Sequence, residues 1–94
     1  MFLQISKDAE DRLRSLLLED DMPCVRIRNY TLGCGWNTSI ILGVSLDEMN
    51  EDDDIKVEVN GITYIAEEAI LGTHGKFFSI FINDKGAISI AKVQ

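Results

Sequence analysis

A cysteine between two glycines is the residue of this chain best suited to chemistry. Cys34 stands in the stretch "RNYTLGCGWNTS", flanked by Gly33 and Gly35 and followed by Trp36. Flanking glycines allow a sharp backbone bend and let another group come close. Amide groups in such a turn can stabilise a thiolate, which is the form of cysteine that attacks electrophiles and binds metals. The stretch indicates a presented thiol; the alternative interpretation is an incidental cysteine in a loop.

Three residues near Cys34 in the sequence could modify its thiol. Arg26 and Arg28 alternate with apolar residues in the preceding segment "CVRIRNY". On a half-exposed strand they would add positive charge, which favours a thiolate. Trp36 would either cover the thiol from water or pack at the edge of the core. These residues are the expected support of the Cys34 site.

Other residues capable of chemistry are few. The predicted strand at 24–30, which lies between Cys24 and Cys34, would by itself span about 20 Å at ~3.3 Å per residue, too far for a disulfide or a shared metal ion unless the loop folds back. Cys24 is therefore interpreted as a structural residue at a strand start, and His74, in "GTHGK", as an exposed loop histidine. The aspartate run at 52–54 lacks the alternating spacing of a calcium loop and indicates a solvated linker. No acid–base pair is evident, so the sequence does not predict an enzyme.

The first half of the chain predicts a strand, a helix and two further strands. "FLQI" at 2–5 is typical of a short strand, and Ser6 is a suitable N-cap for a helix that ends near Asp20. Residues on one face of that helix are apolar, namely Ala9, Leu13, Leu16 and Leu17. Alternating apolar residues then predict strands at 24–30 and 38–46, joined by a loop that holds Cys34.

The second half predicts two hairpins. Asn60-Gly61 favours a type I′ turn, which would set Val59 opposite Ile62, Val57 opposite Tyr64 and Ile55 opposite Ala66. Residues 67–76 are interpreted as a helical turn or irregular connection broken by Gly72 and Gly75. A loop of Asp84, Lys85 and a left-handed Gly86 would set Ile82 opposite Ile88 and Ile80 opposite Ile90. The expected fold is α+β and β-rich: a single domain over 1–94, with six or seven strands and one N-terminal amphipathic helix.

Charge and hydropathy exclude several partners. The formal net charge is −7, which argues against nucleic acid and against anionic membrane surfaces. Apolar runs are too short to span a bilayer, and "MFLQISKDAE" lacks the long hydrophobic region of a cleavable signal. We therefore expect a cytoplasmic protein with reduced cysteines.

The order of these features resembles the HesB/IscA-like family of iron–sulfur biosynthesis proteins, also called A-type carriers. The resemblance rests on "ISKDAEDRLRSLL", "PCVRIRN", the glycine-cysteine-glycine loop, the acidic linker and "VEVNGITYIAEE". It implies a compact β sandwich or pseudo-barrel with a small helix against it. In that family, three cysteines hold iron or an iron–sulfur cluster, usually between subunits. Cys34 matches the first of them.

The resemblance is incomplete at the other two ligands. The family's C-x-C pair would lie beyond Gln94, and "GAISIAKVQ" contains no cysteine. The chain is also similar to short HesB-related proteins that keep only the first cysteine, in some of which selenocysteine replaces it. One cysteine per chain gives two in a homodimer, so an outside thiol such as glutathione or a partner's cysteine would complete a labile cluster.

Three functions follow as alternatives. The first is an accessory protein of iron–sulfur cluster assembly or transfer that works with iron–sulfur assembly proteins, with Cys34 as its family-type ligand. The second is a thiol redox protein with Cys34 as nucleophile, which the selenocysteine relatives favour. The third is a metal-free protein-interaction module. The position of the Cys34 sulfur bears on all three.

Overall fold

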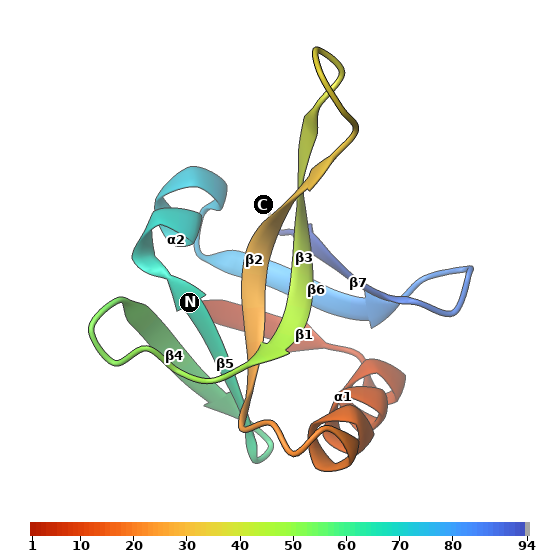
Figure 1. Ribbon diagram of the computed structural model, residues 1–94. Helices are drawn as coiled ribbons and strands as arrows, with labels where there is room; N and C mark the ends of the chain where they lie inside the picture. The colour runs from red at the N-terminus through yellow and green to blue at the C-terminus, as the bar shows by residue number, and fades with distance from the viewer. Residues whose placement is uncertain (94) are drawn as a thin grey trace.

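The protein, described here by a computed structural model, is an α+β fold rich in strands (Figure 1). The structure describes residues 1–93, and within them it has seven strands and two helices. Their order along the chain is β1 (Phe2–Ile5), α1 (Lys7–Glu19), β2 (Cys24–Leu32), β3 (Ser39–Asp47), β4 (Asp54–Val59), β5 (Ile62–Glu67), α2 (Glu68–His74), β6 (Phe77–Ile82) and β7 (Ile88–Lys92). The predicted fold class is confirmed.

The strands form two sheets. One has four strands in the order β3-β2-β5-β4, and the other has three in the order β1-β6-β7. Strand β2 pairs antiparallel with β3 along its whole length, and parallel with β5 from Cys24 to Ile27 only. Strand β1 pairs parallel with β6. Because β3 and β4 lie at opposite edges of their sheet, the acidic linker between them must cross the sheet.

Both predicted hairpins have the expected register. Across β4 and β5, Val59 faces Ile62 and Val57 faces Tyr64, and both turn residues, Asn60 and Gly61, have positive φ as a type I′ turn requires. Across β6 and β7, Ile82 faces Ile88 and Ile80 faces Ile90. Gly86 is left-handed, with φ of 79°. Turn chemistry and apolar alternation agree in each hairpin, which is why the sequence predicted them.

Helix α1 begins as predicted. The Ser6 hydroxyl accepts a hydrogen bond from the Ala9 N–H at 3.3 Å, so it supplies one of the partners that the first turn of a helix lacks. Ala9 and Leu13 on its inner face are fully buried with Val25, Tyr64 and Ile80 from both sheets. This cluster joins the helix to the two sheets and fixes the start of β2.

The connection between β5 and β6 is more helical than predicted. Residues 68–74 form a short helix, α2, and Gly72 lies within it. The helix ends at His74, and the next residue, Gly75, has a φ of 89° that suits glycine. Leu71 packs with Ile27, Ala66 and Phe78 in a second buried cluster, so burial of that side chain outweighs the low helix propensity of glycine. Neither helix in residues 1–93 is long and apolar enough to cross a membrane.

The hydroxyl of Tyr64 is unusual because it is fully buried and has no hydrogen-bond partner among the described residues. Burial raises the pKa of Tyr64 to about 12. A buried hydroxyl without a partner forfeits about 1–3 kcal/mol of solvation.

We therefore expect Tyr64→Phe to leave the free energy of unfolding in urea unchanged or to raise it by up to about 1 kcal/mol. The matched control is Tyr30→Phe, because the Tyr30 hydroxyl donates to the Val44 carbonyl at 3.0 Å. That change should lower stability by about 1 kcal/mol. Equal losses in the two variants would contradict this difference.

Candidate functional site

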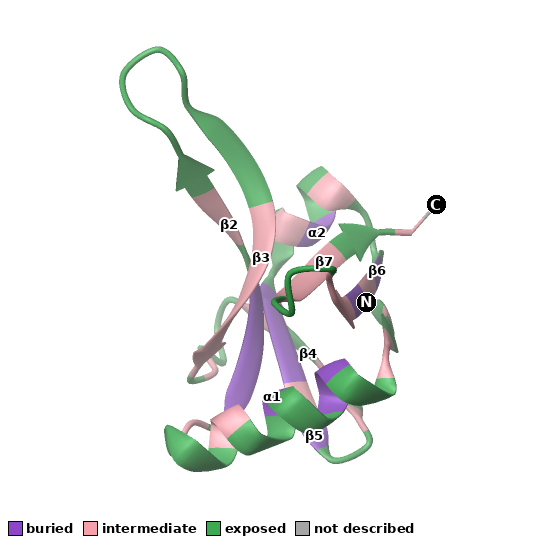
Figure 2. Cartoon of the chain, turned by 90° about the vertical axis from the view of Figure 1, so that its right-hand side faces the viewer, coloured by how far each residue is buried: buried purple, intermediate pink, exposed green. Residues whose placement is uncertain are grey.

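The β2–β3 hairpin extends from the body of the protein as a two-stranded arm. β5 leaves β2 after Ile27, while β2 and β3 stay paired up to Leu32 and Ser39. Every residue from 31 to 41, here called the arm tip, is exposed, as Figure 2 shows in green. The predicted loop is thus held away from the core by a ribbon of paired backbone.

Two glycines shape the turn around Cys34. The Asn37 N–H donates to the Cys34 carbonyl at 3.2 Å, which closes a turn with Gly35 and Trp36 at its centre. Gly35 has φ of 60° and Trp36 has no positive φ, the pattern of a type II′ turn. Gly33 has φ of 95°, and a Cβ there would lie 1.9 Å from the Asn37 carbonyl oxygen. Only glycine fits at Gly33 without a change of the turn.

The two cysteines lie in opposite environments. Cys34 is a free, exposed thiol at the arm tip, and Cys24 is a free, buried thiol at the start of β2. Burial raises the pKa of the Cys24 thiol, so that group is less available as a thiolate. Cys24 therefore has the structural character that the sequence predicted, and Cys34 is the accessible sulfur.

Trp36 does not pack at the core edge, so that expectation was wrong. Its side chain is fully exposed, and Leu32, Ile40 and Ile41 beside it on the arm are also exposed. The alternation that predicted the strand at 38–46 continues past the point where the body can cover it. The arm tip that holds Cys34 therefore also presents exposed apolar side chains.

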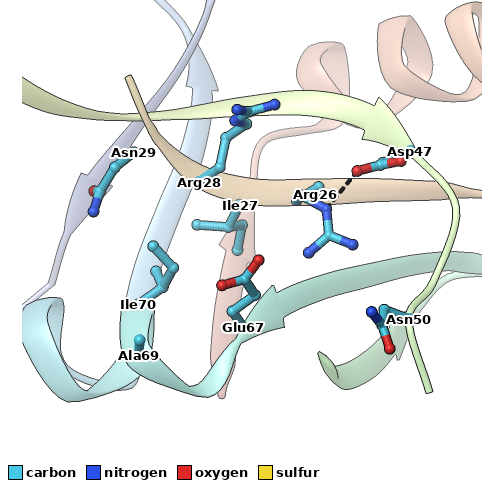
Figure 3. A pocket seen from close by; sticks show the side chains of 9 residues that line it. All are labelled: Arg26, Ile27, Arg28, Asn29, Asp47, Asn50, Glu67, Ala69 and Ile70. Carbon is cyan, nitrogen blue, oxygen red and sulfur yellow. Dashed lines mark hydrogen bonds and ion pairs between the residues drawn. The ribbon is translucent and has the colours of Figure 1, made fainter. Parts of the chain in front are cut away.

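Arg26 does not support Cys34, contrary to the prediction. It is buried, and its Nε donates to Asp47 at 2.6 Å (Figure 3). Its Nη1 and Nη2 donate to the two carboxylate oxygens of Asp54, each at 2.6 Å. About 20 Å of strand, at ~3.3 Å per residue, separates it from the end of β2 at Leu32. Its positive charge is paired with Asp47 and Asp54, away from the arm tip.

Arg26 instead fastens the acidic linker to the sheet. Asp47 ends β3 and Asp54 begins β4, so Arg26 holds both ends of the crossing segment. The Arg26 guanidinium lowers the pKa of both carboxyl groups, chiefly through these hydrogen bonds. The alternation of "CVRIRNY" predicted an exposed arginine, but the linker folds over this face and buries it.

This arrangement sets a pH dependence of stability. Because the native pKa of Asp47 and of Asp54 lies below the ordinary value of 3.8, the unfolded chain takes up protons at these groups first. The free energy of unfolding should be fully supported above about pH 5 and should fall as the pH decreases toward the native pKa values. Urea unfolding between neutral and acid pH measures this; Arg26→Met should flatten the slope, and an unchanged slope would contradict the assignment.

Arg28 lies at the base of the arm rather than at its tip. Its guanidinium stands over the Tyr30 ring, 5.1 Å from the centroid. The Tyr30 ring in turn covers Gly43 on β3, where a Cβ would approach it to 2.5 Å. Arg28 thus stabilises the ribbon through an aromatic contact. Its predicted position beside Cys34 is not the one it takes.

A cleft of about 510 Å³ lies at the base of the arm, where β5 turns away from β2 (Figure 3). It is lined by Arg26, Ile27, Arg28, Asn29, Asp47, Asn50, Glu67, Ala69 and Ile70. Cys34 is not among these residues, so the cleft and the thiol are separate features.

His74 is not an exposed loop histidine, contrary to the prediction. It ends α2, is half-buried, and its Nε2 donates to the Asn29 Oδ1 at 2.7 Å. Burial lowers the pKa of His74 and favours the neutral ring. The side chain joins α2 to β2, which is a structural contact.

Residues 1–93 contain no group of three or more His, Cys, Asp or Glu side chains arranged to hold a metal ion. Cys34 alone provides one sulfur ligand, whereas iron–sulfur clusters are generally held by four ligands. Any metal or cluster bound at Cys34 therefore needs ligands from outside this part of the chain.

The turn glycines give a matched test of the arm tip. Gly35→Ala should cost about 1 kcal/mol, because an L-residue in left-handed backbone loses roughly that much and the Cβ meets nothing within 4 Å. Gly33→Ala should cost more, because its Cβ collides with Asn37. Amide hydrogen exchange along the ends of β2 and β3 measures the difference; equal exchange rates in the two variants would show that the turn at Gly33 is not constrained.

Comparisons with known proteins place the fold. No family model matches the chain, and no curated protein matches it. Among solved structures, it is similar to Escherichia coli SufA, described as involved in biosynthesis of iron–sulfur clusters, with a TM-score of 0.68 and 16% identity over 97% of this chain and 80% of SufA. It is also similar to IscA solved with a [2Fe-2S] cluster, with a TM-score of 0.65 and 14% identity over 97% of this chain and 82% of IscA.

A third similar structure is a protein from Aquifex aeolicus solved by NMR, with a TM-score of 0.61 and 13% identity over 99% of this chain and 93% of that one. The TM-scores show a shared fold, and identities this low show no more than the fold. The resemblance noted in the sequence is thus confirmed at the level of the fold, which this chain shares with SufA and IscA along nearly its whole length.

Proposed function

We propose that this protein is an accessory factor of iron–sulfur cluster assembly or transfer, with a cluster or iron as its cargo and Cys34 as its ligand. The observation that carries the proposal is the free Cys34 thiol, exposed on an extended arm of a fold shared with SufA and IscA. A thiol in this position is open to iron and to a second protein at the same time.

The ligand count defines how the cargo is held. Cys34 provides one thiolate, and the remaining ligands come from a second copy of the chain, a small thiol such as glutathione, or a cysteine of an iron–sulfur assembly protein. Ligands shared in this way exchange one at a time by thiolate substitution. A cargo held so is weakly retained, which suits transfer better than storage.

The exposed side chains of the arm support this use. Leu32, Trp36 and Ile40 lie on the same arm tip as the thiol and are exposed. Contact with a partner would bury them and would exclude water from iron bound at Cys34. The arm thereby links docking to ligation: the surface that binds the partner also shields the cargo.

Anaerobic purification after co-expression with cluster-assembly proteins tests the proposal. We expect sulfur-to-iron absorption in the visible range, together with protein-bound iron and sulfide. A protein that stays colourless and iron-free, under conditions that load IscA in parallel, would contradict it.

The same exposed thiol supports a thiol redox function as the second candidate. Such a protein would react with alkylating agents and peroxide much faster than an unfolded control, because catalysis by cysteine requires a stabilised thiolate. Arg26 and Arg28 are engaged elsewhere, so these two arginines do not supply the positive charge expected for that role. Labelling of Cys34 at the rate of the denatured chain would remove this candidate and leave ligation intact.

A further inference from the structure

We propose that Asn60 is a site of self-modification, at which the backbone nitrogen of Gly61 displaces the side-chain amide, and that the buried carboxylate of Glu10 controls both the rate and the consequence. This inference is independent of Cys34 and of the proposed function. Figure 1 places the β4–β5 turn, which holds Asn60 and Gly61, beside α1 and at the opposite end of the molecule from the arm.

The turn supplies both reacting groups. Asn60 and Gly61 are exposed, and they form the only Asn-Gly pair of the sequence. The backbone nitrogen of glycine is the least hindered of any residue, because no side chain stands beside it. The Gly61 N–H donates no turn hydrogen bond within residues 1–93, so it is open to water. The exposed turn therefore holds an electrophilic amide next to an accessible nucleophile.

The reaction needs water alone as co-reactant. The Gly61 nitrogen loses its proton to solvent and bonds to the Cγ of Asn60. The bond between Cγ and Nδ2 breaks, and that nitrogen takes up a proton and leaves as ammonia, so that a cyclic imide forms in the turn. Water then adds to either carbonyl of the imide, and the ring bond from that carbonyl to nitrogen breaks. The product is aspartate or isoaspartate at position 60, and no atom is oxidised or reduced.

Glu10 holds the nitrogen that has to leave. The Asn60 Nδ2 donates to the Glu10 Oε2 at 2.9 Å. Arg14 donates to the other Glu10 oxygen at 2.9 Å and to the Asn60 carbonyl at 3.0 Å. The Glu10 side chain is only 9% exposed, so water competes poorly for these contacts. Loss of Nδ2 requires that its hydrogen bond to Glu10 be broken, and the folded contact therefore slows the reaction.

The product places two carboxylates where the native chain has a hydrogen bond. Aspartate at position 60 has no side-chain N–H to donate, and its charge would face the buried Glu10 carboxylate. Arg14 already bonds both residues and would offset part of the repulsion. Isoaspartate would also add one carbon to the main chain of a turn in which both residues need positive φ. Either product should loosen α1 from the β4–β5 hairpin.

Peptide mapping by mass spectrometry tests the site. The folded full chain is incubated in mildly alkaline buffer, and conversion at Asn60 is compared with conversion at Asn37 and Asn50, which are also exposed but precede threonine and glutamate. We expect Asn60 to convert first, yet about tenfold more slowly than in the urea-unfolded chain, because a hydrogen bond to a charged group is worth roughly that factor. Earlier conversion of Asn37 or Asn50, or equal rates in the folded and unfolded chains, would overturn the proposal.

Two substitutions of Glu10 test its control of the rate. Glu10→Ala removes the acceptor and should speed conversion of the folded chain by about tenfold. Glu10→Gln keeps an acceptor oxygen and should leave the rate near that of wild type. Circular dichroism shows that each variant is folded during the incubation. A rate that Glu10→Ala leaves unchanged, or that both variants raise equally, would contradict control by this contact.

A mimic of the product tests the consequence without waiting for the reaction. Asn60→Asp keeps a residue that suits the type I′ turn, and should lower the urea midpoint by roughly 1 M. Combining it with Glu10→Gln exchanges the amide and the carboxylate between the two positions and should restore most of the midpoint. Asn37→Asp at the arm tip should leave the midpoint unchanged. An unchanged midpoint in Asn60→Asp, or the same loss with and without Glu10→Gln, would contradict the proposed repulsion.

Discussion

Cys34→Ser is expected to abolish the visible absorption and the bound iron of anaerobically purified protein while leaving the fold intact. Cys34 is exposed and packs against no core residue, so its loss should leave the free energy of unfolding within about 0.5 kcal/mol of wild type. A serine hydroxyl does not ionise near neutral pH and is a poor ligand for iron in a sulfur-rich site. The measurement is iron and sulfide content per chain, alongside far-ultraviolet circular dichroism.

Cys24→Ala is the matched control, because it also removes a thiol but one that is buried. This variant should keep its iron and lose some stability through the small cavity it leaves. Iron retained by Cys34→Ser, or lost only in Cys24→Ala, would show that Cys34 is not the ligand.

Arg26→Met is expected to cause the largest loss of stability of any single change considered for this chain. The Asp54 side chain is 0% exposed and relies on Arg26 for its charge partner. Removing one partner of a buried ion pair typically costs about 3–5 kcal/mol, because the other charge stays buried alone. The total free energy of unfolding of a native domain is only about 5–15 kcal/mol. Urea unfolding followed by circular dichroism measures the loss.

Two controls isolate the buried charge. Arg28→Met removes an arginine from the same strand but only an exposed aromatic contact, and should cost less than about 1 kcal/mol. Arg26→Met combined with Asp54→Asn should regain part of the loss, since the uncompensated carboxylate is then gone. A single Arg26→Met variant as stable as Arg28→Met would contradict the role of Arg26 in holding the linker.

The parts of the fold set by short-range rules could be predicted from sequence. Asn60-Gly61 and Gly86 prescribe turns, and the apolar alternation beside them admits only one register. Ser6 precedes α1 as its N-cap, because its hydroxyl accepts a hydrogen bond from the first turn. In each case the local preference and the buried face demand the same structure.

Long-range packing accounts for what sequence reasoning missed. Arg26 is buried because the linker between β3 and β4 crosses the sheet, and strand order is not visible in the alternation of "CVRIRNY". Trp36 stays exposed because the β2–β3 hairpin extends beyond the rest of the protein, where no other described element packs against it. His74 is half-buried because α2 is a helix that brings it to Asn29. One signal was available for Arg26: aspartates stand at both ends of the linker.

Native mass spectrometry of the anaerobically loaded protein tests the central claim most directly, because it reports which chains and thiols accompany the cargo. The account predicts that every cluster-bearing species contains a second chain, a partner protein or a bound small thiol, and that Cys34→Ser removes these species. A single chain that carries a cluster with no added thiol would contradict the claim that Cys34 is one ligand of a shared site.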